Sequence, residues 1–219
     1  MTGAVSAELE SVRVTRLLRE DIVLGRRAPG SRLVERDIAA ELNVSRLPVR
    51  EAIRSLVVEG IVTTRPRTWA VVKEFTAQDV QDVAEVREAF ETLTFQLAAQ
   101  RHDAAGLARL REALDREAAS ARRGDFDAGR LAAGDFHTCA ADLTGNEMLR
   151  EMLQVFSTRL RWLFGQHEDL DEMVIEHEVL FDAVAARDVE LLGVLVPRHL
   201  ARGRALAERR LRERTESAV

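Results

Sequence analysis

Apolar side chains recur every three or four residues over most of this chain, and this spacing predicts amphipathic helices. The first helix is expected over residues 6–24, because Gly25 provides a typical stop. Two shorter helices are expected over residues 32–42 and 46–59, joined by a tight turn that contains Asn43. Two helices joined in this way form a helix-turn-helix unit, which the preceding helix would brace.

After the third helix the apolar spacing changes to that of short strands. Residues 61–64 and 70–73 predict two strands joined by the loop RPRTW, and together they would form a β-hairpin wing. Arg65 and Arg67 would lie at the tip of the wing, where guanidinium groups can meet the phosphates or the minor groove of a nucleic acid. Trp69 is expected to pack the wing against its own domain.

From Thr76 to the C-terminal end the pattern is that of helices. Thr76 and Asp79 form a capping-box pair, and the first helix would run to about residue 101. Its apolar face is expected to consist of Val80, Val83, Phe90, Leu93 and Leu97. Further helices are expected over residues 104–123, 126–143, 147–165, 169–187 and 189–213. Six helices of this length predict an antiparallel bundle.

The pattern therefore predicts a mostly α-helical protein of two domains. Residues 1–75 would form a winged helix-turn-helix domain of three helices and a small β-hairpin wing, and residues 76–219 a six-helix antiparallel bundle. The first domain has an excess of basic residues and the second an excess of acidic residues, within a formal net charge of −5. Such a chain can bind nucleic acid, because counterion release depends on the local patch that meets phosphate.

The sequence lacks the features of several other protein classes. Cys139 is the only cysteine, which excludes an intramolecular disulfide and a cysteine metal cluster. No signal-like segment or apolar run of membrane-spanning length is found, so we expect a cytoplasmic protein with no membrane partner. Glu-x-x-His pairs, phosphate-binding glycine loops, HExxH and GxSxG are also missing. We therefore expect a binding protein and not an enzyme.

The helix predicted over residues 46–59 carries one basic and one apolar stripe. Ser45 is a suitable N-cap, and Pro48 is tolerated in the first turn, where an amide hydrogen would lack an intrahelical acceptor. The basic stripe is Arg46, Arg50 and Arg54, and the apolar stripe is Val49, Ala52, Ile53 and Leu56. Arginines at the start of such a helix can reach guanine edges and phosphates in a major groove. On an arbitrary helix the same stripe would more often be a solvated face.

The residues between positions 29 and 60 favour the DNA-binding interpretation. The pattern is Pro29, Gly30, Leu33, Glu35, Ile38, Ala39, Leu42, Val44, Ser45, Arg46, Pro48, Val49, Arg50, Glu51, Ala52, Leu56, Glu59 and Gly60. In these residues the chain resembles the winged-helix domain of the GntR family of bacterial regulators. The resemblance implies DNA contacts by Arg36, Ser45, Arg46 and Arg50.

Three histidines fall on the third, fifth and sixth predicted helices of the bundle: His137, His177 and His199. Facing helices can bring such side chains together, and neutral imidazoles suit a divalent transition metal such as zinc or nickel. A single helical histidine is more often a hydrogen-bonded core residue. The spacing alone therefore leaves both interpretations open.

Motifs around these histidines add a second resemblance. They are Phe136-His137, Gly145-Asn146, Glu176-His177 and Arg198-His199-Leu200. With them, residues 76–212 resemble the FCD ligand-binding domain of FadR-type regulators. The resemblance implies a metal site of three histidines and an aspartate one turn before the first, but Ala133 occupies that position. Asp135 lies about 200° around the helix from His137 and cannot simply replace it. Pro197 predicts a kink that would reorient His199.

The same resemblance implies that Arg87 meets the carboxylate of an organic-acid effector, a group that a guanidinium binds in a bidentate manner. A salt bridge between Arg87 and Glu91 is the alternative. His137, His177 and His199 would contact the effector through a metal or, without one, by hydrogen bonds to an anionic ligand.

Together these features predict a homodimeric transcriptional regulator, a repressor, that binds a palindromic operator in double-stranded DNA. A small organic-acid metabolite bound in the helical domain would modulate it. The alternative is a nonspecific architectural DNA-binding protein without an effector, whose binding would depend strongly on salt and little on sequence.

Overall fold

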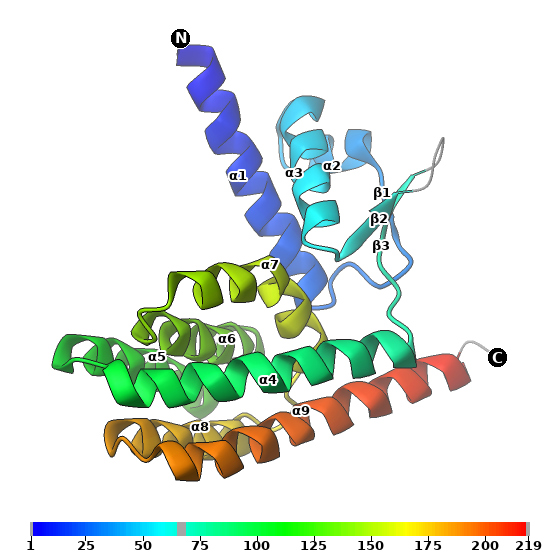
Figure 1. Ribbon diagram of the computed structural model, residues 1–219. Coiled ribbons are helices and arrows are strands. Elements are labelled where there is room, and N and C mark those ends of the chain that lie inside the picture. Colours follow the sequence, from blue (N-terminus) through cyan, green and yellow to red (C-terminus); the bar gives the residue numbers. More distant parts are fainter. Residues whose placement is uncertain (1, 65–68, 218–219) are drawn as a thin grey trace. The chain divides into compact units, whose positions relative to one another are not determined.

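A computed structural model of the chain describes residues 2–64 and 69–217. The chain divides into two compact units, Met1–Glu74 and Phe75–Val219, one residue before the boundary expected from the sequence. The described residues are mostly helical, which confirms the predicted fold class (Figure 1). Arg65 and Arg67, which were expected at the tip of the wing, lie outside the described residues.

Within its described residues, the N-terminal unit contains three helices and a small sheet. They are α1 (Thr2–Val23), β1 (Arg32–Leu33), α2 (Glu35–Glu41), α3 (Arg46–Val58), β2 (Val62–Thr64) and β3 (Ala70–Val72). The strands pair antiparallel in the order β1-β3-β2. The helices and the pair formed by β2 and β3 confirm the winged helix-turn-helix prediction.

The strand β1 corrects the prediction that residues 32–42 form one helix. Arg32 and Leu33 pair with the central strand β3, so their backbone groups join a sheet and α2 begins only at Glu35. The side chain of Leu33 is buried, which anchors the strand to the core. The wing is therefore part of a three-stranded sheet and not an isolated hairpin.

The core of the N-terminal unit lies between α1 and α3, which pack closely together. Its fully buried residues include Val14, Leu18 and Ile22 of α1 and Val49, Ala52 and Leu56 of α3. Their spacing of three and four residues places one apolar stripe of each helix in this contact. The first helix thus braces the helix-turn-helix, as the sequence predicts.

The ends of α3 follow the predicted signals in part. Ser45 occupies the N-cap position with extended backbone, but its side chain accepts no capping hydrogen bond. At the other end Gly60 has a φ of 74°, in the left-handed region that favours glycine. The helix stops at Val58, one residue earlier than predicted.

The C-terminal unit is a bundle of six helices in its described residues. They are α4 (Ala77–Arg101), α5 (Ala104–Arg123), α6 (Phe126–Leu143), α7 (Glu147–Phe164), α8 (Leu170–Ala185) and α9 (Val189–Ser217). Helix α9 packs along α4, while α5 packs against α6 and α8 (Figure 1). This arrangement confirms the predicted helical bundle. Among the described residues, every helix is too short or too polar to cross a membrane.

Side-chain caps determine where these helices begin. Thr76 accepts a hydrogen bond from the Asp79 amide, and the Asp79 carboxylate accepts one from the Thr76 amide, which is the predicted capping box. The caps of α5 to α8 are Asp103, Asp125, Asn146 and Asp169. Each cap satisfies an amide that has no intrahelical acceptor, so the helix starts lie within one residue of prediction.

The buried face of α4 differs from the predicted apolar face. Val80 is buried as predicted, whereas the side chain of Leu93 is 43% exposed. The buried stripe instead runs through Arg87, Glu91 and Phe95 at four-residue intervals. The apolar pattern missed this stripe because two of its members are charged.

Helix α9 continues through Pro197 from Val189 to Ser217. Proline lacks the amide hydrogen that would bond the carbonyl of Gly193, so a local bend was expected to turn His199 away. His199 is nevertheless buried, and its ring lies 5.4 Å from that of His137. Pro197 therefore does not remove His199 from the other histidines.

Candidate functional sites

Helix α3 presents its three arginines on the side away from the core. Arg46, Arg50 and Arg54 are exposed, while the apolar stripe of the same helix is buried. Residues four apart lie above one another on a helix, so the guanidinium groups form a row. Arg36 of α2 is exposed as well. This is the surface that a winged helix-turn-helix offers to a major groove.

Acidic neighbours hold several of these arginines. Arg50 donates two hydrogen bonds to Glu35, from Nε to Oε1 at 3.0 Å and from Nη2 to Oε2 at 2.9 Å. The hydrogen bond from Arg50 lowers the pKa of the Glu35 carboxyl. Arg54 and Arg36 each donate a single hydrogen bond, to Glu51 and Asp37 respectively, at 2.9 Å. The sequence did not indicate that these acids hold the arginines in place.

Two residues near α3 differ from their expected roles. Ser45 is exposed and does not cap the helix, so its hydroxyl faces solvent beside the arginine row. Trp69, expected to pack the wing on its domain, is 52% exposed, and the Arg32 guanidinium lies 5.8 Å from its ring centre. The tryptophan is therefore only partly packed.

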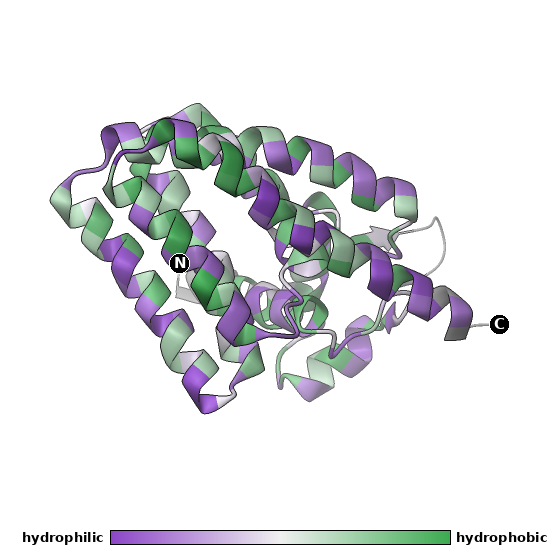
Figure 2. Cartoon of the chain, turned by 90° about the horizontal axis from the view of Figure 1, so that it is seen from below, coloured by the Kyte–Doolittle hydropathy of each residue, from purple (hydrophilic) through white to green (hydrophobic). Residues whose placement is uncertain are grey.

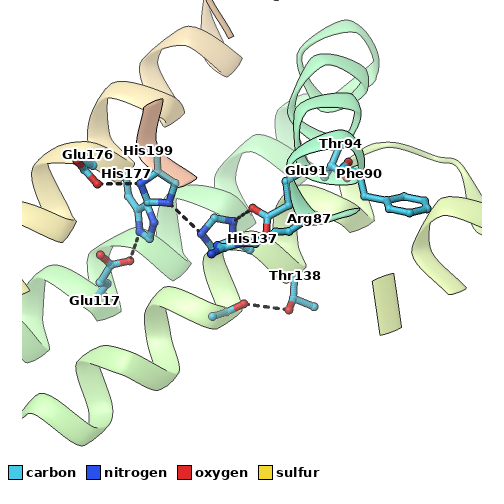
Figure 3. A network of polar contacts seen from close by, with 11 residues as sticks. Arg87, Phe90, Glu91, Thr94, Glu117, His137, Thr138, Glu176, His177 and His199 are labelled. Atoms are coloured by element: carbon cyan, nitrogen blue, oxygen red, sulfur yellow. Dashed lines mark hydrogen bonds and ion pairs between the residues drawn. The ribbon is translucent and has the colours of Figure 1, made fainter. Parts of the chain in front are cut away.

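In the C-terminal unit, helices α6, α8 and α9 bring His137, His177 and His199 together (Figure 3). One ligand nitrogen from each ring lies within 4.8 Å of the other two. His137 Nε2 and His199 Nε2 are 3.4 Å apart. Three predicted residues from distant parts of the sequence thus meet at one point.

Each imidazole has a carboxylate behind its Nδ1 atom. His177 Nδ1 lies 2.7 Å from Glu117 Oε2, and both side chains are fully buried. His199 Nδ1 lies 2.8 Å from Glu176 Oε2. His137 Nδ1 lies 2.6 Å from an oxygen of Glu91. A carboxylate that accepts Nδ1–H leaves the Nε2 lone pair of the same ring free to bind a metal.

The state of the cluster fits a metal ion. Burial lowers the pKa of His199 to about 3 and also lowers the pKa of His137, so both rings are neutral at pH 7. His177 Nε2 is buried and has no hydrogen-bond partner among the described residues. A buried nitrogen without a partner is unfavourable unless a ligand occupies its lone pair. Neutral nitrogen donors of this kind suit zinc or nickel.

Arg87 lies on α4 in direct contact with this network. Its Nε donates to Glu91 Oε1 at 2.7 Å, which is the salt bridge considered from the sequence. Burial would raise the pKa of Glu91, but Arg87 and His137 lower it well below its ordinary value. The guanidinium also lies 5.0 Å from the ring centre of Phe164. Glu91 thus connects the predicted effector arginine to a predicted metal ligand.

Among the described residues, no carboxylate joins the group of three histidine ligands in place of the aspartate that the family resemblance implies. Ala133 is buried against Leu170 and Met173. Asp135 pairs with Arg161 at 2.8 Å and does not join the histidines, as its position around the helix predicts. The described cluster therefore offers three protein ligands.

Sequence reasoning missed the supporting residues of the cluster. Glu117 follows Leu110 and Leu114 along the buried stripe of α5, and a charge in such a stripe was the available signal. Glu176 adjoins His177 in sequence but contacts His199 in space. His167 was also missed, and its pKa is lowered to about 3 by burial and by the nearby histidines.

Comparisons with known proteins give a separate family match for each of the two units, the one with the arginine row and the one with the histidine cluster. Residues 10–72 match the bacterial regulatory proteins of the gntR family, and residues 82–202 match the FCD domain. The HTH-type transcriptional regulator LutR of Bacillus subtilis is 31% identical over 187 residues, which cover 74% of this chain and 84% of LutR. The HTH-type transcriptional repressor RspR of Escherichia coli is 27% identical over 192 residues, covering 86% and 84%.

The fold is also found in solved structures. The structure of E. coli McbR/YncC superposes with a TM-score of 0.80 at 21% identity and covers 92% of this chain and 98% of that chain. The relatives LutR and RspR are transcriptional regulators and not enzymes. The chain is therefore a DNA-binding transcriptional regulator that belongs to the GntR family and carries an FCD domain.

Proposed function

We propose that this regulator is a repressor that binds a palindromic operator as a homodimer and responds to a small carboxylate metabolite. The observation that carries the proposal is the meeting of three imidazoles, two of them buried, in a chain that also has an exposed arginine row. The arginine row suits DNA and the imidazoles suit a ligand, so the chain has a surface for each partner. Such a regulator would act in the bacterial cytoplasm.

The DNA-contact residues are those of α3 and its surroundings. The arginine row would reach base edges and phosphates in the major groove; it consists of Arg46, Arg50 and Arg54. The sugar-phosphate backbone of the DNA would be contacted by Ser45 and Arg36. A wing carrying Arg65 and Arg67 would add phosphate or minor-groove contacts. Two such surfaces related by a twofold axis would read an inverted repeat.

Unpartnered apolar side chains support dimerisation through the bundle. Val86 and Leu93 of α4 and Val194 of α9 are 45%, 43% and 67% exposed. Helices α4 and α9 pack side by side, so these residues belong to neighbouring elements. Figure 2 shows apolar segments among the polar ones along the bundle helices. Covering such residues with a second copy would remove apolar surface from water and stabilise the dimer.

For the imidazole cluster we propose a divalent transition metal, zinc or nickel, held by His137, His177 and His199. In the described residues this group has three ligands, one fewer than a closed structural zinc site. A bound ion would supply Lewis-acid coordination to an oxygen of the effector. The three histidines would hold the ion, and the carboxylates behind them would keep the rings in place.

Arg87 would bind the second polar group of the effector. It is buried, it contacts Glu91, and Glu91 contacts His137, so a ligand at the histidines would also meet this ion pair. A ligand carboxylate offers the same acceptor geometry as Glu91 and could share or take over the guanidinium. If the ligand binds one conformation of the dimer better than another, operator affinity would change by about 5- to 150-fold.

Fluorescence anisotropy with chelator-stripped and zinc-loaded protein tests the proposal. The operator is first selected from a library of random duplexes, and a scrambled duplex of the same composition serves as the control. We expect tight binding of the selected duplex only. Small carboxylic acids should change this affinity in the zinc-loaded protein, and the matching carboxamides should not. Equal affinity for all duplexes without any response to acids would instead support an architectural DNA-binding protein.

A further inference from the structure

Glu117 is a fully buried acid that no arginine neutralises in the described part of the chain. Its Oε2 atom contacts His177 Nδ1 at 2.7 Å, while its Oε1 atom is buried without a hydrogen-bond partner. A carboxylate in such a place is costly unless an opposite charge compensates it. A positive charge close to Glu117 would therefore be stabilising.

The other two carboxylates of the cluster each have an arginine. Glu91 accepts a hydrogen bond from Arg87, and Glu176 accepts one from Arg202. Arg202 also pairs with Glu172, whereas Glu117 has no guanidinium partner in the described part of the chain. Glu117 lies behind the most deeply buried histidine of the three.

Glu117 also determines which nitrogen of His177 faces the centre of the cluster. Glu117 Oε2 lies 2.7 Å from His177 Nδ1, where it can accept a proton that this nitrogen carries. The Nε2 lone pair then points away from Glu117, and this buried atom has no hydrogen-bond partner among the described residues. The arrangement leaves this nitrogen as a donor atom for a cation, and Figure 3 shows the contact between His177 and Glu117.

We infer that Glu117 is the positioning residue of the metal site, which fixes the tautomer of His177 and supplies the charge that a divalent cation neutralises. The inference rests on the proposed metal site. It assigns to Glu117 a role in metal affinity and no stabilising role in the metal-free protein. Without metal, the buried charge of Glu117 opposes folding, and with metal it stabilises the complex.

Zinc titration of the full, chelator-stripped chain tests this role with Glu117→Gln. Glutamine keeps the shape and can still accept from Nδ1–H, but it carries no charge. We expect zinc affinity to fall about 10- to 100-fold. The stripped variant should melt at or above the temperature of the stripped wild type, because a buried charge is gone. Glu117→Asp, which keeps the charge but shortens the reach, should have intermediate affinity.

Glu178→Gln is the matched control, because Glu178 also lies next to α5 but is 37% exposed and pairs with Arg111. It should leave zinc affinity unchanged. Zinc affinity in Glu117→Gln within about twofold of wild type would overturn the role of Glu117 while leaving the metal site intact. A stripped variant that melts well below the stripped wild type would identify a structural ion pair and overturn it too. Failure of the wild type to bind zinc would overturn the metal site and this role together.

Discussion

The arginine row of α3 and the histidine cluster of the bundle are both held by carboxylates, but in opposite surroundings. Arg50 and Glu35 have side chains that are 50% and 33% exposed, whereas His177 and Glu117 are fully buried. An exposed ion pair is weak in water, so a DNA phosphate or base can replace Glu35 as the partner of Arg50. A buried carboxylate has no water to move into, so Glu117 stays in place when a ligand arrives.

The same type of contact therefore has opposite effects on ligand binding. Glu35 keeps Arg50 ordered but competes with DNA for it. Glu117 holds His177 in the geometry that a cation needs and does not compete with the cation, because it contacts the other ring nitrogen. Burial and the choice of atom, and not the residue types alone, decide whether an acid opposes or supports binding.

The largest expected effect is the loss of metal from His177→Ala. Removing one of three ligands leaves two, and two imidazoles do not make a stable site for zinc or nickel. Elemental analysis of purified protein should find about one metal ion per chain in the wild type and background levels in the variant. His102→Ala is the matched control, because His102 stands at the C-cap of α4 outside the cluster. Equal metal content in the wild type and in His177→Ala would contradict the site.

Arg50→Ala should have the next largest effect, on DNA instead of metal. Loss of a bidentate base contact should weaken operator binding by about 10- to 100-fold. Anisotropy titrations should show a smaller loss on a scrambled duplex, because nonspecific binding depends on the total charge. If Arg50→Ala kept full operator affinity at physiological salt, α3 would not be the reading helix.

Arg87→Ala should leave operator affinity unchanged and remove the response to carboxylic acids. The change of about 5- to 150-fold that the acid causes in wild type should disappear, because the acid loses its guanidinium partner. Arg111→Ala, which breaks another arginine–glutamate pair of the same bundle, should keep the response. A variant at Arg87 that still releases DNA when acid is added would show that the effector binds elsewhere.

The sequence predicts most of the fold because its signals are local. Gly60 lies two residues after the last residue of α3, and Thr76 and Asp79, which cap the start of α4, are three residues apart. The strand β1 could not be predicted in this way, because Arg32 and Leu33 become a strand only through β3, which is distant in sequence. The local apolar pattern predicts a helix at Arg32 and Leu33, but their pairing with β3 makes them a strand.

The residues of the candidate site likewise fall into a group that local sequence motifs indicate and a group that only tertiary contacts define. Family motifs and helix spacing indicated the three histidines, but their carboxylates come from elsewhere in the chain. Glu117 is 60 residues from His177, and helix packing alone brings them together. The identity of a ligand residue can be carried by a motif, whereas the residue behind it is defined by the tertiary contact.

The smallest expected effect, Glu35→Gln, tests the sign of the comparison directly. Glutamine removes the charge that competes for Arg50, so operator affinity should rise, by no more than about fivefold, because exposed ion pairs are weak. Glu41→Gln corrects for the change in net charge, since Glu41 lies on the same helix but pairs with Arg27. A lower operator affinity in Glu35→Gln than in Glu41→Gln would mean that Glu35 positions Arg50 for DNA. Glu35 would then support ligand binding as Glu117 does. Burial would not decide whether a carboxylate supports or opposes the binding of a ligand.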